Sequence, residues 1–209
     1  MGHAAMAATA VRYLRTAGGP APAGPVDPLP RPDLRAVADD ERAPVDPAEF
    51  RRVLGNFATG VTVITAPDPD PDLSGSPAGF ACQSFAALSL DPPLVVFMVA
   101  RTSRTWPRIA RAGAFCVNVL GAHQGDLCRG FAVSGGDKFA GVGHTPSPVS
   151  GSPRLTGATA WADCTIHAVH PGGDHLIVVG RVDALGTCDD DGDGAPLLFH
   201  RGRFGGFTG

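Results

Sequence analysis

The sequence predicts a mainly β domain in which antiparallel strands close into a barrel or sandwich, with short helices between the strands. Residues 61–65 form a β-branched run, which favours a strand. Side chains alternate over 160–169, a turn follows at 171–174, and 175–182 returns as a second strand, which together indicate a hairpin. The uninterrupted apolar segment 94–99 predicts a strand that is buried on both faces.

Local signals predict the remaining elements. Asp46, Pro47 and Glu49 are typical of an N-cap, a first helical position and a capping box. Apolar residues then recur at helical spacing and predict one apolar helix face, at Phe50, Val53, Leu54 and Phe57. Further strands are expected at 78–85, 115–120 and 197–200, further helices at 106–112 and 123–132, and loops at 67–77 and 133–154. Gly113 is a plausible end of the first of these two helices.

Composition limits the class of protein. The chain has 209 residues, is 44% hydrophobic and carries a formal net charge of −3. The length and hydrophobic fraction predict one globular domain, and the charge predicts no basic surface for nucleic acid or membrane. The apolar run 94–100 is too short to span a bilayer, and Arg12 and Arg15 interrupt the apolar N-terminus, so a cytoplasmic protein is expected. We expect a flexible extension rich in Pro, Ala and Gly at 1–45 and a folded domain at 46–209.

Cysteine and aspartate patterns indicate no metal site. The five cysteines are widely spaced and contain no C-x-x-C pair, which argues against a disulfide framework and against zinc. Asp189, Asp191, Asp193 and Gly194 match part of a calcium-binding EF-hand loop, but the twelfth position is His200 instead of a bidentate Glu. This segment is therefore interpreted as an acidic turn between strands.

Three clusters are candidates for a ligand site. Residues 82–85 end a predicted strand with small and polar side chains, and residues 100–105 place hydroxyls and guanidiniums before a short helix, where phosphate binds well. Residues 173–175 place a histidine at a hairpin turn. Taken alone, each has an ordinary structural interpretation: a strand with a polar outer face, N-capping by Ser103 or Thr105, and a solvent-exposed turn.

In order and context, these clusters resemble the flavin reductase-like family, which has the FMN-binding split-barrel fold. The resemblance is more specific to the short-chain reductase components of two-component flavin-dependent monooxygenases, and it runs from about Phe50 to Phe204. The stretches that carry it are 57–65, 89–95, 102–105, 115–120, 137–142, 173–175 and 201–204.

The resemblance implies roles for particular residues. Gln83, Ser84 and Phe85 would lie along the flavin ring, and His175 would contact the nicotinamide of NAD(P)H. The other implied flavin-binding residues are Ala100, Ser103 and Thr105 at the phosphate, Lys138 and Phe139 in a closing loop, and Arg203 and Phe204 at the end of the pocket. The implied activity is reduction of FAD or FMN by NADH or NADPH, with the reduced flavin passed to a partner monooxygenase. A homodimer with the site near the subunit interface is also implied.

The chain departs from the family pattern at positions that the resemblance places next to the flavin. Gln83-Ser84-Phe85 stands where many members have Asn-Ala-Phe, and Phe204 stands where Tyr is common. FAD is favoured over FMN. NADH is favoured over NADPH because the sequence has no obvious cluster of arginines to bind the 2′-phosphate of NADPH. The alternatives are a non-enzymatic flavin- or haem-binding split barrel, an oxidase of a phosphorylated pyridoxine-like substrate, and a β-barrel interaction module.

Overall fold

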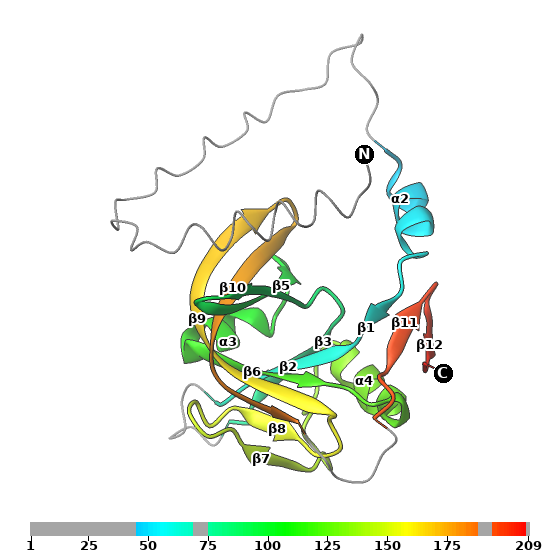
Figure 1. Ribbon diagram of the computed structural model, residues 1–209. Helices are drawn as coiled ribbons and strands as arrows, with labels where there is room; N and C mark the ends of the chain where they lie inside the picture. The colour runs from blue at the N-terminus through cyan, green and yellow to red at the C-terminus, as the bar shows by residue number, and fades with distance from the viewer. Residues whose placement is uncertain (1–44, 69–74, 188–193, 208–209) are drawn as a thin grey trace, which may run out of the picture. The chain divides into compact units, whose positions relative to one another are not determined.

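The computed structural model describes residues 45–68, 75–187 and 194–207, and Val45–Gly209 forms one compact unit of the chain. Its centre is a seven-stranded antiparallel sheet in the order β3-β2-β6-β9-β10-β5-β4 (Figure 1). These strands are β2 (Thr62–Ala66), β3 (Ala78–Cys82), β4 (Ala86–Leu90), β5 (Pro93–Ala100), β6 (Ala114–Val119), β9 (Ala160–Gly172) and β10 (His175–Thr187). The mainly β, split-barrel prediction is confirmed. The predicted extension, Cys188 and the acidic turn at 189–193 lie outside the described residues.

The connection between β3 and β4 shows that the sheet is curled. These strands are its two edges, yet only Gln83, Ser84 and Phe85 separate them in the chain. In a flat sheet of seven strands the edges would be about 29 Å apart, whereas this connection spans at most about 14 Å. The sheet therefore bends until its edges approach each other.

Two apolar clusters fill the barrel and its flank. The first is built around Phe97 and Phe115, whose rings meet edge to face at 5.1 Å, and it includes Ile109 from α3 (Trp106–Ala112). The second includes Phe131 from α4 (Gly125–Ala132), which packs edge to face on Phe139 at 5.1 Å. The two helices thus join the sheet through separate cores.

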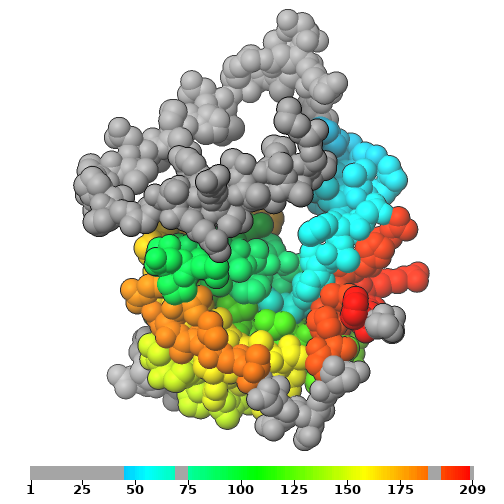
Figure 2. Space-filling view, in the orientation of Figure 1, coloured from blue at the N-terminus to red at the C-terminus, as the bar shows by residue number. Residues whose placement is uncertain are grey.

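Smaller elements complete the unit. A three-stranded sheet contains β1 (Thr59–Gly60), β11 (Leu198–His200) and β12 (Arg203–Gly205), and a two-stranded sheet contains β7 (His144–Pro146) and β8 (Pro153–Leu155). The 3-10 helix η2 (Ala122–Gln124) precedes α4. Helix α2 (Pro47–Leu54) lies beside β11 and β12 (Figure 2), and the Arg201 N–H donates to the Gly55 carbonyl.

Several local predictions are confirmed. Asp46 caps α2 by accepting a bond from the Glu49 N–H at 3.2 Å, and Gly113 ends α3 in the left-handed conformation with φ 71°. The hairpin also forms, although its strands run on to Gly172 and to Thr187. Among the described helices, none is both long and apolar enough to cross a membrane.

Other predictions are corrected. Strand β5 is buried on alternate residues only, because one of its faces borders a pocket at Met98, which is 40% exposed. The predicted apolar face of α2 is exposed, since its residues pack against no core of the described unit. The strands β1, β4, β7, β8 and β12 were not predicted, and β4 lies on the edge of the sheet, where apolar alternation is weak.

Candidate functional site

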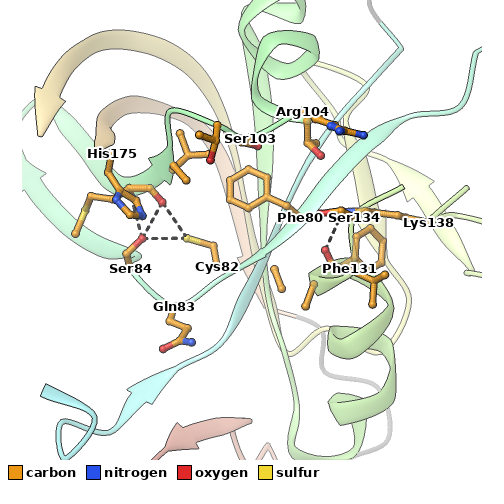
Figure 3. Close-up of a pocket in the computed structure, with 18 of the residues that line it drawn as sticks. Phe80, Cys82, Gln83, Ser84, Ser103, Arg104, Phe131, Ser134, Lys138 and His175 are labelled. Carbon is orange, nitrogen blue, oxygen red and sulfur yellow. Dashed lines mark hydrogen bonds between the residues drawn. The ribbon is translucent and has the colours of Figure 1, made fainter. Parts of the chain in front are cut away.

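A pocket of about 700 Å³ opens where the two edges of the sheet meet. Its walls come from the end of β3, the end of β5, the segment 102–105, and the segment 131–135, which includes the last two residues of α4. Figure 3 shows His175 and Ser84 at one end and Arg104 and Lys138 at the other, with Phe80 between them. One end therefore combines an imidazole with strand backbone, and the other is cationic.

Ser84 seals the junction between the sheet edges. The β4–β5 ladder pairs Ala86 with Val96, so the same register would bring Ser84 opposite Met98. There the side chain replaces the backbone: the Ser84 hydroxyl accepts from the Met98 N–H at 2.9 Å and donates to the Met98 carbonyl at 3.0 Å. The backbone of the 83–85 connection is outside the ladder at this point, and Gln83 and Ser84 line the pocket wall.

The segment after β5 supplies hydroxyls and charge. The Ser103 N–H closes a turn on the Ala100 carbonyl at 2.9 Å, and its hydroxyl accepts from the Trp106 N–H at 3.2 Å. Ser103 therefore caps α3, as one sequence alternative predicted, whereas the Thr105 hydroxyl makes no capping bond within the described chain. Arg104 lines both this pocket and an adjoining hollow of about 390 Å³.

The adjoining hollow lies between α3 and the segment 135–138. Arg104, Arg108 and Lys138 line it, and Asp137 is its acidic member. The Asp137 carboxylate accepts from the Phe139 N–H at 3.0 Å, and Arg108 donates to the Ser76 carbonyl. Three cationic side chains therefore border one continuous hollow, which suits a phosphorylated ligand.

Lys138 ties this segment to the barrel. Its ammonium donates to the Gly79 carbonyl at 3.2 Å and to the Phe131 carbonyl at 3.0 Å, near the C-terminal end of α4. A lysine has three N–H donors, so one remains for a ligand. Partial burial lowers the pKa of Lys138 below its usual 10.5, because desolvation disfavours the charged form.

His175 reaches the pocket from the tip of the β9–β10 hairpin. Its Nδ1 donates to the Asp174 carboxylate at 2.7 Å, which leaves Nε2 as an acceptor in the neutral ring. This hydrogen bond, and the charge of the imidazole, lower the pKa of Asp174. The Asp174 carbonyl accepts from the Arg101 N–H at 3.0 Å, so the hairpin tip is attached to the segment that follows β5.

The structure brings together seven of the predicted site residues. Those that line the pocket are Gln83, Ser84, Ala100, Ser103, Thr105, Lys138 and His175. Phe85 packs against the first core, and Phe139 is 7% exposed within the second. Arg203 and Phe204 border a different hollow beside Ala58, so this chain by itself does not bring them to the pocket.

Sequence reasoning missed other lining residues. They are Phe80, Ala81, Met98, Val99 and residues 131–135, whereas Cys82 belonged to a candidate cluster without an assigned role. Phe80 and Met98 lie within strands, where local pattern does not distinguish a core-facing side chain from a pocket-facing one. Thr102 and Arg104 belong to a segment that the sequence did single out, although no individual role was assigned to them.

A family model described as the flavin reductase like domain matches residues 54–208. The chain belongs to this family. A flavin-dependent monooxygenase reductase subunit from Rhodococcus jostii is 52% identical over 162 residues, which are 78% of each chain. A flavin reductase from Pseudomonas putida is 46% identical over 174 residues, covering 83% of this flavin reductase-like chain and 98% of the relative.

Solved structures agree with this assignment. Nitrilotriacetate monooxygenase component B from Mycobacterium thermoresistibile matches with a TM-score of 0.71 and 48% identity, over 77% of this chain and 86% of that one. An NADH:FAD oxidoreductase from Streptomyces globisporus, solved with NAD and FAD fragments, matches with a TM-score of 0.71 and 34% identity, over 84% of this chain and 98% of that one. The flavin reductase-like fold is therefore shared along nearly the whole described unit.

Proposed function

We propose that this chain is an NAD(P)H-dependent flavin reductase that supplies reduced flavin to a separate monooxygenase. The observation that carries the proposal is the pocket at the sheet junction, which has an imidazole at one end and cations at the other, in a chain of the flavin reductase-like family. Enzymatic relatives favour this interpretation over a non-enzymatic carrier, because they are named as reductases and as reductase subunits.

The residues present fit a flavin. A volume of about 700 Å³ lies in the range of pockets that enclose small ligands and cofactors. Gln83 and Ser84 offer backbone donors to the polar edge of a flat ring, and Arg104 and Lys138 offer charge to a phosphate. We propose Phe85 as a support of this wall from the core side, and Ala100, Ser103 and Thr105 as the backbone and hydroxyl part of the phosphate site.

Flavin, when bound, supplies the chemistry by accepting a hydride from the nicotinamide. The chain's own residues bind and orient the two nucleotides. His175 is proposed to hold the nicotinamide end, and Asp174 fixes the orientation of its ring through the Nδ1 hydrogen bond. We assign no proton transfer to the pair.

FAD is the proposed flavin. The hollow that continues the main pocket past Arg104 gives a second phosphate and its nucleoside a place that FMN would leave unfilled. NADH is the proposed donor, supported by the Streptomyces globisporus relative, which is named an NADH:FAD oxidoreductase.

The partner, compartment and assembly are also proposals. Relatives named as monooxygenase reductase subunits support transfer of the product to a monooxygenase. A reducing, cytoplasmic compartment fits the four described cysteines, which are buried and form no disulfide with one another. A homodimer would cover the exposed apolar face of α2 and offers a route by which Arg203 and Phe204 of one copy approach the pocket of the other. Residues 46–209 are proposed to be the catalytic domain, with 1–45 as an appended extension.

The test is NADH oxidation by the purified full chain, followed at the nicotinamide absorbance band, with FAD or FMN in excess over protein. Catalytic consumption that increases with added flavin is expected, with a lower KM for FAD than for FMN. Binding of flavin without oxidation of NADH or NADPH would instead support the carrier. A lower KM for FMN would overturn the FAD preference alone.

A further inference from the structure

The Ser84 hydroxyl occupies the gap where the β4–β5 ladder ends. Two residues beyond the last regular pair, it takes both hydrogen bonds of the Met98 peptide groups that face the opening: the N–H at 2.9 Å and the carbonyl at 3.0 Å. Without this hydroxyl, the Met98 N–H would lose its partner, and the Met98 carbonyl would keep only the longer contact with the Cys82 thiol, at 4.0 Å.

A neighbouring thiol completes the arrangement. The Cys82 Sγ lies 3.3 Å from the Ser84 Oγ, and Cys82 is 4% exposed (Figure 3). The Cys82 thiol also donates to the Met98 carbonyl, with 4.0 Å between Sγ and the oxygen, so Cys82, Ser84 and Met98 form one closed group of contacts. Burial raises the pKa of Cys82, so the thiol keeps its proton at neutral pH.

A serine hydroxyl has one donor and two acceptor sites. Met98 uses the donor and one of the acceptor sites, and the Cys82 thiol lies against the hydroxyl at 3.3 Å, so the Ser84 proton is not available to a ligand in the pocket that the side chain lines. We therefore expect its effect on a ligand to be indirect, through the distance between the 83–85 connection and β5. That distance sets the width of the pocket at the end where His175 lies.

We propose that the Ser84 hydroxyl is a positioning group that joins the 83–85 connection to β5 and thereby sets the affinity of the pocket for flavin. The inference rests on the proposed function for its ligand, but the Ser84–Met98 contact itself does not. This role of the Ser84 side chain adds to the one implied by the family resemblance, in which the residue lies along the flavin ring.

The first experiment compares Ser84→Ala, Ser84→Thr and, as a matched control, Ser89→Ala in the full chain. Ser89 lies on the edge strand β4, which follows the 83–85 connection, is opposite Leu94 and does not line the pocket. Ser84→Ala is expected to weaken FAD binding about tenfold in a fluorescence titration, with kcat at saturating FAD changed by less than about twofold. Ser84→Thr keeps the hydroxyl and is expected to restore most of the affinity, and Ser89→Ala to match the parent.

The second experiment measures the hydrogen bond between Ser84 and the Met98 N–H directly. The chain has three methionines, Met1, Met6 and Met98, so selective ¹⁵N-methionine labelling isolates the Met98 amide in a simple spectrum. We expect Ser84→Ala to speed hydrogen exchange of this amide at least about tenfold, while Ser84→Thr and Ser89→Ala leave it protected.

Unchanged FAD affinity and unchanged Met98 exchange in Ser84→Ala would overturn the proposal. A fall in kcat at unchanged affinity would also overturn it, because the hydroxyl would then act on the reaction itself. If the parent chain neither binds flavin nor oxidises NADH, the proposed function fails, and the Met98 exchange rates still decide whether Ser84 holds the junction.

Discussion

His175 owes its position to the register of the hairpin. Gly172 pairs with His175, so Gly173 and Asp174 form a two-residue turn, and Gly173 has φ 72°, a conformation that L side chains rarely adopt. The same strand pairs His175 with Ala100, which brings the imidazole to the segment proposed to hold phosphate. Local turn chemistry therefore sets the distance between two functional groups that are far apart in the chain.

Replacement of His175 by Ala tests the nicotinamide role. We expect the KM for NADH to rise about tenfold and the dissociation constant of FAD to change less than about twofold, since the lost contacts concern the nicotinamide end. Steady-state kinetics and a flavin titration measure the two effects. His170→Ala, on the neighbouring strand opposite Ile177, is the control and should behave as the parent. An unaltered KM and rate in His175→Ala would contradict the role.

The lowered pKa of Lys138 predicts that the affinity for flavin falls at alkaline pH. Its pKa in the folded chain is lowered, so the ammonium loses its proton at a lower pH than an exposed lysine would, and its attraction for phosphate is lost with it. The dissociation constant of FAD, titrated from about pH 7 to pH 9.5, should therefore rise toward the alkaline end. Lys138→Arg keeps its charge throughout this range and should flatten the profile. Identical profiles for both proteins would exclude a role for the Lys138 charge.

At the scale of elements, β10 depends on a glycine where it crosses the first core. A Cβ at Gly180 would lie 2.4 Å from the Phe115 Cζ, and Phe115 is fully buried against Phe97. The register of β9 and β10 also shifts between Val179 and Gly180. The hairpin that carries His175 therefore passes the core at a point with no room for a side chain.

Gly180→Ala is expected to lower the free energy of unfolding by roughly 1–3 kcal/mol, because Phe115 must move in a packed core. Denaturant titration measures the change. Gly60→Ala is the control, since a Cβ at Gly60 meets nothing within 4 Å. Gly130→Ala, in α4 and equally unobstructed, should have the opposite sign and raise stability by about 0.5–1 kcal/mol through helix propensity. Equal stability of Gly180→Ala and the parent would show that the core adapts without cost.

At the scale of the whole molecule, α2 presents an apolar face that nothing in the described unit covers. Phe50, Leu54 and Phe57 line a hollow together with Gln83, which also lines the main pocket. Phe57 is 78% exposed, which is costly for a residue of this size in water. A second copy of the chain placed here would cover this face beside the mouth of the site.

The proposed homodimer predicts a change of mass on polar substitution of this face. Leu54→Gln with Phe57→Ser should halve the mass measured by light scattering, because the apolar contact is lost while the core is untouched. Val149→Ser, at an exposed apolar residue far from α2 in the sequence, serves as the control and should keep the parent mass. A parent chain that is already monomeric at micromolar concentration would refute the dimer.

Sequence pattern by itself determined the elements whose signals are local. The β-branched run of β2, the alternation of β9, the capped start of α2 and the glycine end of α3 all depend on residues close together in the chain. The same holds for the segment 100–105 and for His175, which the pattern correctly assigned to the ends of elements. These predictions succeed because capping, turns and alternation are decided within a few residues.

Tertiary structure alone decided what meets across the sheet. The curl that joins β3 to β4 puts Met98 opposite Ser84, buries Phe139 in the second core and leaves Arg203 and Phe204 away from the pocket of their own chain. The tertiary structure also leaves the apolar face of α2 exposed and places one face of β5 beside the pocket. Curvature and register result from the packing of all seven strands at once, so no local stretch of sequence encodes them.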